Sequence, residues 1–106
     1  MNNRISYKEF ESYPKFESRY AAVKWLKEKY GEDFFFSKEG ELDNEPYYIY
    51  TYILNKEVFD RMLEYMRKNG REGTWYGGKP ETKGFRECSQ EILIWENGKV
   101  QVQSLI

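Results

Sequence analysis

Apolar side chains recur at helical spacing in the first third of the chain. Five of them are separated by four, three, three and four positions: Phe16, Tyr20, Val23, Leu26 and Tyr30. This spacing places them on one stripe of a helix. Pro14 suits the first position of such a helix, since its missing N–H needs no partner there, and Gly31 is a natural stop. The pattern predicts a helix over residues 14–30.

A second helical pattern follows Asn55, which suits an N-cap. Its apolar face is formed by Val58, Met62 and Met66, with Phe59 and Leu63 beside them. The dipeptide Asn69-Gly70 predicts its end. A shorter helical turn is expected over residues 6–10, because Ser6 and Glu9 have the spacing of a capping box.

Between the two helices, residues 47–54 alternate with a period of two, which is typical of a strand. One side of this strand carries Tyr48, Tyr50 and Tyr52, and the other side carries Tyr47, Ile49, Thr51 and Ile53. Branched aliphatic residues suit a core covered by helices. We therefore expect the three tyrosines to lie on the open face of a sheet.

Three further strands are predicted. The run Phe34-Phe35-Phe36 indicates a strand over residues 33–37, followed by a loop or wide hairpin over 38–45. Near the end, Asn97-Gly98 separates residues 92–95 from 100–106, a strong hairpin signal. A two-residue turn there would place Trp95 opposite Val100. Residues 71–90 give no clear pattern.

The resulting order is α-β-β-α-β-β within a single domain, residues 1–106. We expect an α+β fold, in which an antiparallel sheet of four to five strands carries both main helices on one face. Apolar residues make up 40% of the 106-residue chain and aromatic residues 19%, a composition that argues against disorder. The oligomeric state is not specified by any pattern.

The chain contains no histidine, which excludes His-based acid–base catalysis, Ser-His-Asp and Cys-His arrangements, and ordinary zinc sites. Its single cysteine, Cys88, cannot form an internal disulfide or a cysteine metal cluster. No phosphate-loop or dinucleotide motif occurs, and the carboxylates do not follow a calcium-loop spacing. We expect a protein that is not an enzyme and has no cofactor or metal.

No segment has the length of a transmembrane helix, and the N-terminus lacks an apolar signal core. These features predict a cytoplasmic protein without a membrane partner. Few alanines and prolines, with many Lys, Glu, Tyr, Phe, Ile and Asn, resemble the residue usage of low-GC bacteria and their phages.

The charged residues are segregated, although the net charge is only −1. Residues 28–45 carry a net charge of −5, whereas residues 67–86 carry +4. Such separation steers association with a charged partner. The acidic segment can imitate phosphates toward a nucleic-acid-binding protein.

These features favour a small non-catalytic binding protein that inhibits or neutralises a larger protein by occlusion. Phage anti-defence proteins and toxin-neutralising immunity proteins, which belong to phages or mobile elements, are examples of this class. The predicted contact surface combines the tyrosine side of the strand with the acidic segment: Tyr48, Tyr50, Tyr52, Glu39, Glu41, Asp43 and Glu45.

Two alternatives use other residues or another partner. A small-ligand or nucleotide binder would use the basic, glycine-rich segment 67–86, with these side chains at its site: Arg67, Arg71, Trp75, Tyr76, Lys79, Lys83 and Arg86. A single-stranded nucleic-acid binder would instead stack bases on the tyrosine side of residues 47–54.

Overall fold

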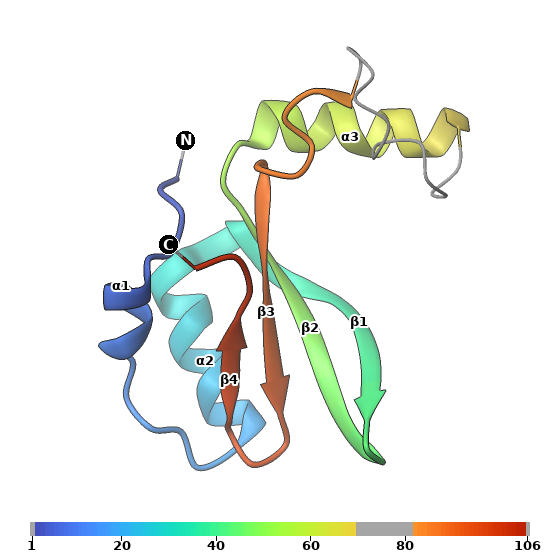
Figure 1. Ribbon diagram of the computed structural model, residues 1–106. Coiled ribbons are helices and arrows are strands. Elements are labelled where there is room, and N and C mark those ends of the chain that lie inside the picture. The colour runs from blue at the N-terminus through green and yellow to red at the C-terminus, as the bar shows by residue number, and fades with distance from the viewer. Residues whose placement is uncertain (1, 70–81, 106) are drawn as a thin grey trace.

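The computed structural model describes residues 2–69 and 82–105. In chain order the elements are α1 (Tyr7–Glu11), α2 (Arg19–Tyr30), the short 3₁₀ helix η1 (Gly31–Asp33), β1 (Phe34–Leu42), β2 (Glu45–Ile53), α3 (Lys56–Asn69), β3 (Ser89–Trp95) and β4 (Val100–Val102). The four strands form one sheet in the order β1-β2-β3-β4, and all neighbours are antiparallel (Figure 1). The predicted α+β class is confirmed.

Local capping signals are confirmed at two helices. The Ser6 hydroxyl accepts a hydrogen bond from the backbone N–H of Glu9 at 3.1 Å, and the Asn55 side chain accepts one from Val58 at 3.2 Å. The longer N-terminal helix starts later than predicted, because Ser18 is its N-cap and binds the backbone N–H of Ala21 at 3.1 Å. Pro14 therefore precedes the helix instead of opening it.

The predicted loop over residues 38–45 is mostly strand. β1 continues to Leu42, which pairs with Glu45 across a two-residue turn. The turn residues Asp43 and Asn44 have φ values of 52° and 66°, the left-handed conformation that a type I′ turn requires. Asp and Asn tolerate this conformation, so no glycine is needed. A bulge between Phe36 and Lys38 interrupts the β1–β2 pairing.

The β3–β4 hairpin differs from its prediction by one residue. Ile94 pairs with Val100, and the Trp95 N–H donates to the Lys99 carbonyl at 3.0 Å, so the loop contains three residues instead of two. Gly98, at φ 91°, completes it. This register places the side chains of Ile94 and Val100 on one face, together with Ile92.

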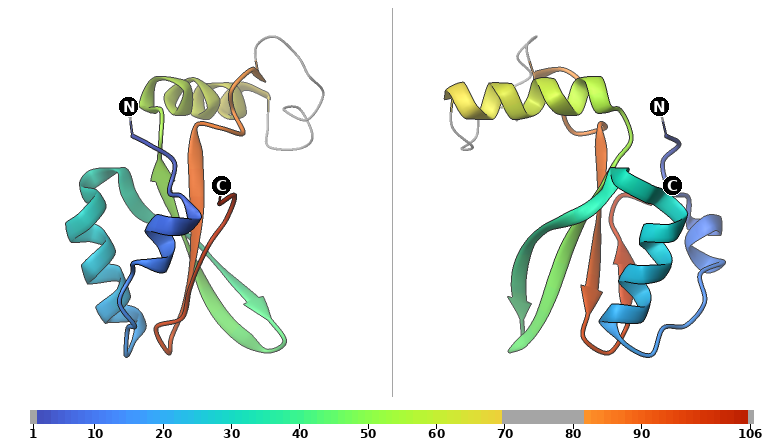
Figure 2. Two further views of the ribbon diagram at one scale, coloured as in Figure 1. Left: turned by 60° about the vertical axis from the view of Figure 1, so that its left-hand side comes forward. Right: turned by 180° about the vertical axis from the view of Figure 1, so that it is seen from behind.

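Helices α2 and α3 pack on different apolar clusters, in contrast to the prediction that they share one face (Figures 1 and 2). Ala22 and Leu26 of α2 bury the side chains of one sheet face. Helix α3 lies across the end of the sheet, where its apolar side packs against Ile53 and Phe35. These two residues project away from α2, because neighbouring positions of a strand point to opposite faces.

Candidate functional site

The tyrosine side of β2 lies under α2 for most of its length. Tyr50 and Tyr52 are each only 6% exposed and belong to the cluster that includes Leu26 and Ile92. The prediction that Tyr48, Tyr50 and Tyr52 occupy the open face is therefore wrong. Two of the three rings are core residues. The base-stacking surface on which the nucleic-acid alternative depends is not available at those positions.

Aromatic packing explains why the rings are buried. Tyr50 stacks on Phe34 of β1, with ring centroids 5.0 Å apart, and Tyr52 packs on Tyr30 of α2 at 4.4 Å. Tyrosine also carries its hydroxyl at the far end of the ring, so the polar atom can reach the edge of a core.

Tyr48 differs from the other two tyrosines because it is only partly buried. The Arg19 guanidinium lies 3.7 Å from the centre of its ring, and Arg19 Nε contacts Glu96 at 3.1 Å. The Tyr48 hydroxyl donates a hydrogen bond to Glu96, and this bond raises the pKa of Tyr48. Tyr48 thus belongs to a cation–π and carboxylate cluster at the start of α2, where the β1–β2 hairpin begins to separate from the helix.

The predicted acidic residues lie together on that hairpin. Glu39, Glu41, Asp43 and Glu45 are all exposed, as is every residue from 36 to 46 except the half-buried Gly40. The hairpin splays away from α2 and β4 toward its tip (Figure 2). Among the described residues, no basic side chain forms an ion pair with these four carboxylates. The hairpin is therefore an acidic projection whose four carboxylates have no ion pair within the described part of the chain.

Apolar side chains accompany these carboxylates, a feature that the sequence reasoning missed. Phe36 is 50% exposed and Leu42 is 59% exposed. Phe36 lies on the same sheet side as Phe34, and the edge of its ring contacts Tyr50, with the ring centroids 5.5 Å apart. The signal was present in the sequence: Leu42 is the one apolar residue in the acidic run 38–45.

Helix α2 adds a third exposed apolar residue on the side that faces β1. Lys27 of α2 donates to the carbonyl of Phe34 at 2.8 Å, which fixes that side of the helix. Tyr20 precedes Lys27 by seven positions, and residues seven apart share one helix face. The Tyr20 side chain is 77% exposed. Tyr20 is therefore an exposed aromatic residue on the side of α2 that faces β1.

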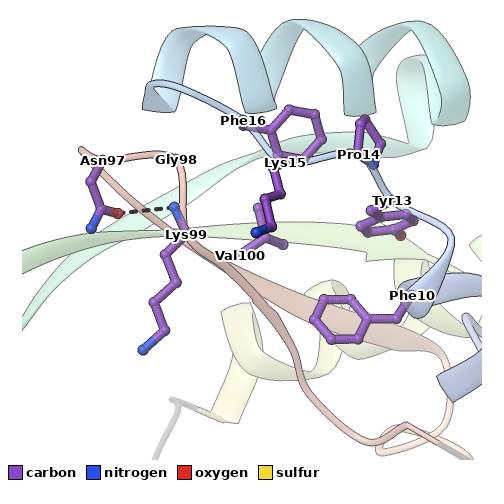
Figure 3. Close-up of a pocket in the computed structure, with 9 residues that line it drawn as sticks. All are labelled: Phe10, Tyr13, Pro14, Lys15, Phe16, Asn97, Gly98, Lys99 and Val100. Atoms are coloured by element: carbon purple, nitrogen blue, oxygen red, sulfur yellow. Dashed lines mark hydrogen bonds between the residues drawn. The ribbon is translucent and has the colours of Figure 1, made fainter.

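A cavity of about 330 Å³ lies between the segment that joins α1 to α2 and the β3–β4 turn (Figure 3). Aromatic rings and two lysines dominate its lining: Phe10, Tyr13, Pro14, Lys15, Phe16, Asn97, Gly98, Lys99 and Val100. These nine residues include no carboxylate and no cysteine, and their ionisable side chains are those of one tyrosine and two lysines.

A smaller cavity, of about 200 Å³, lies between the start of β2, next to the turn of the acidic hairpin, and the end of β3. It is lined by Glu45, Pro46, Trp95, Glu96 and Asn97. Two carboxylates beside an indole ring attract a cation. Lys99 already illustrates this preference, since its ammonium group lies 5.0 Å from the centre of the Trp95 ring.

The hydroxyl groups of Tyr13 and Tyr30 form a chain that ends at a carboxylate. Tyr30 donates to Glu9 at 2.5 Å, and the two hydroxyl oxygens are 2.5 Å apart. Desolvation by burial raises the pKa of Tyr13 to about 12, and it also raises the pKa of Tyr30. Both hydroxyls therefore stay protonated at neutral pH. The chain ties α1 to α2.

The basic segment proposed for ligand binding is only partly described. Arg67 forms an ion pair with Glu64 on α3. The backbone carbonyl of Lys83 accepts a hydrogen bond from the Arg61 side chain. Arg86 lines a cavity of about 570 Å³ beside α3. The remaining predicted ligand residues lie outside the described part of the chain: Arg71, Trp75, Tyr76 and Lys79.

Residues 2–69 and 82–105 contain no group of three or more Cys, Asp and Glu side chains that could hold a metal ion. Over the same residues, no helix combines the length and apolar character needed to cross a bilayer.

Comparison of the chain with protein-family models, with curated proteins and with solved structures found no match.

Proposed function

We propose that this protein is a small non-catalytic binding protein that inhibits or neutralises a larger protein partner by occlusion. The observation that supports this function best is the acidic β1–β2 hairpin. Its carboxylates form no ion pair with other described residues, and it carries exposed apolar side chains at Phe36 and Leu42. Aromatic and aliphatic anchors within a charged rim are typical of protein interfaces.

Occlusion follows from the shape and charge of the hairpin. A two-stranded projection enters a groove more readily than the flat face of a sheet does. A groove that binds nucleic acid or nucleotides is lined by Lys and Arg, so carboxylates inside it would occupy the positions of phosphates. Phage anti-defence proteins and immunity proteins of toxins are examples of small single-domain inhibitors.

Complementary charge also sets the kinetics of such a complex. Opposite potentials raise the association rate, and salt weakens this effect because the Debye length falls to about 8 Å at physiological ionic strength. We therefore expect the complex to form more slowly as salt rises. The apolar contacts of Phe36 and Leu42 would then limit its dissociation.

Partner capture tests the proposal. The wild-type protein, a Glu39→Lys/Glu41→Lys variant and a Glu28→Lys/Glu32→Lys control are immobilised and exposed to a lysate of a low-GC bacterium. The control changes the net charge equally, at exposed carboxylates of α2 and η1. The wild type and the control should retain the same protein, the hairpin variant should lose it, and the free protein should inhibit the captured protein's activity stoichiometrically.

Other outcomes reject specific parts of the proposal. Equal capture by all three proteins would show that the hairpin is not the contact surface. Capture without loss of the partner's activity would exclude occlusion. If no protein is retained and a nucleotide raises the melting temperature, the ligand-binding alternative replaces the proposal.

A further inference from the structure

The outer edge of β1 presents backbone groups that no described strand pairs with. β1 is the first strand of the sheet, and its only partner among the described strands is β2. Below the bulge, the five residues from Lys38 to Leu42 are exposed apart from Gly40, which is half-buried. An open edge of this kind is a template for a further strand.

The side chains along this edge select what can pair with it. Glu39 and Glu41 lie on the same side of β1, since they are two positions apart. A second copy of this chain pairing antiparallel at this edge would bring glutamates close to glutamates, and like charges directly opposite each other are destabilising. The edge therefore disfavours self-association and accepts a strand of positive charge.

The opposite side of β1 restricts which residues the added strand can carry at every second position. Lys38 and Gly40 point to this side, and the Tyr47 ring lies over Gly40. A basic residue facing Lys38 would be repelled, whereas a small or neutral residue fits beside the Tyr47 ring. The matching sequence alternates a basic residue with a neutral one.

We propose that the β1 edge binds an extended segment of the partner, with alternating Lys or Arg residues, by adding it to the sheet as a fifth strand. This inference rests on the proposed function, since it states how the acidic hairpin would hold its target. The backbone groups of Lys38–Leu42 provide the hydrogen bonds, and Glu39 and Glu41 provide the cross-strand ion pairs.

A short peptide in which lysine alternates with threonine is the probe, and hydrogen exchange of the β1 amides is the readout. A strand added to the edge protects the outward-pointing amides of Lys38–Leu42 at every second residue, by about tenfold at roughly ten times the Kd. The Glu39→Lys/Glu41→Lys variant should bind at least about tenfold more weakly. The Glu28→Lys/Glu32→Lys control should keep wild-type affinity.

A peptide with glutamate in place of lysine should bind only the charge-reversed variant. Methylation of the peptide nitrogens that face β1 should abolish binding, whereas methylation of the intervening nitrogens should not. Binding without alternating protection would mean contact through side chains alone, which overturns strand addition but leaves the proposed function intact. Absence of binding to the lysine–threonine peptide would also overturn strand addition. Failure of partner capture would reject the function itself.

Discussion

The side-chain amide of Gln90 forms a pair of hydrogen bonds with the backbone of Ile5. Gln90 Oε1 accepts from the Ile5 N–H at 2.8 Å, and Nε2 donates to the Ile5 carbonyl at 3.0 Å. Nε2 also donates to the Gln103 carbonyl at 3.1 Å. One side chain of β3 therefore holds the N-terminal segment beside the sheet, as a neighbouring strand would.

Replacing this glutamine should destabilise the fold. In Gln90→Leu, the buried N–H and carbonyl of Ile5 lose their partners, and an unsatisfied buried polar group costs about 1–3 kcal/mol. We expect the free energy of unfolding to fall by about 2–3 kcal/mol in urea titrations. Gln101→Leu, at an exposed position of β4, is the control and should change it by less than about 0.5 kcal/mol. Equal stability of Gln90→Leu and wild type would contradict this role.

Gly98 should not tolerate a side chain. A β-carbon there would overlap the carbonyl oxygen of Phe16 and lie 3.0 Å from the Ser18 nitrogen, both of them backbone atoms. With φ at 91°, Gly98→Ala also carries conformational strain. Gly84, at φ 85°, has only a Val58 methyl group nearby at 3.5 Å. We expect Gly84→Ala to lose about 1–2 kcal/mol from strain alone, and Gly98→Ala to lose more. Thermal unfolding of both variants measures the two losses of stability.

Folding stability should decrease at alkaline pH because of the hydroxyl chain of Tyr13 and Tyr30. An unfolded tyrosine has a pKa of about 10, whereas burial raises the pKa of native Tyr13 to about 12. The unfolded state then releases its proton first, so stability is complete below about pH 10 and is lost as pH rises through about 12. Urea titrations across this range should show a shallower decline for Tyr13→Phe. Tyr20→Phe, at an exposed ring, should keep the wild-type decline.

The Cys88 thiol should react only when the protein opens. It is 1% exposed, burial raises its pKa, and its Sγ donates to the Phe85 carbonyl at 3.0 Å. Because the thiolate is the reactive form, labelling by a disulfide reagent should be slow in buffer and should accelerate with urea. Ser37→Cys adds an exposed thiol and should react at once with one equivalent of reagent. Rapid labelling of native Cys88 would contradict its packing.

Local signals in the sequence predicted the helices, strands and turns better than they predicted the strand register or which side of a strand is buried. The caps at Ser6 and Asn55 depend on residues three positions apart, and both are present. The hairpin at Asn97-Gly98 also formed, but a glycine at positive φ serves loops of two and of three residues, so the dipeptide did not fix the register. The difference of one residue places Val100 opposite Ile94 instead of Trp95.

The tyrosine strand was assigned to the wrong face for a related reason. Its alternation was predicted correctly, but the choice of the buried side was based on a preference for aliphatic residues in cores. The cluster under α2 instead uses Tyr50 and Tyr52, whose rings have partners in Phe34 and Tyr30. Such long-range pairing cannot be obtained from spacing along one segment, and neither can the contact between Ile5 and Gln90. The exposed acidic residues were easier to predict, since charged side chains rarely become buried.

Single substitutions should separate the structural tyrosines from the surface one. Tyr50→Ala removes a ring stacked on Phe34, and truncation of a buried aromatic residue costs about 3–5 kcal/mol. Tyr48→Ala removes a partly exposed ring that lies under the Arg19 guanidinium, so it should cost about 1 kcal/mol and leave the fold intact. Tyr50→Phe is the control that keeps the ring, and it should remain close to wild type. Urea titrations followed by near-ultraviolet circular dichroism compare the three variants. A loss in Tyr48→Ala as large as that in Tyr50→Ala would mean that Tyr48 is a core residue and cannot serve as a contact for a partner.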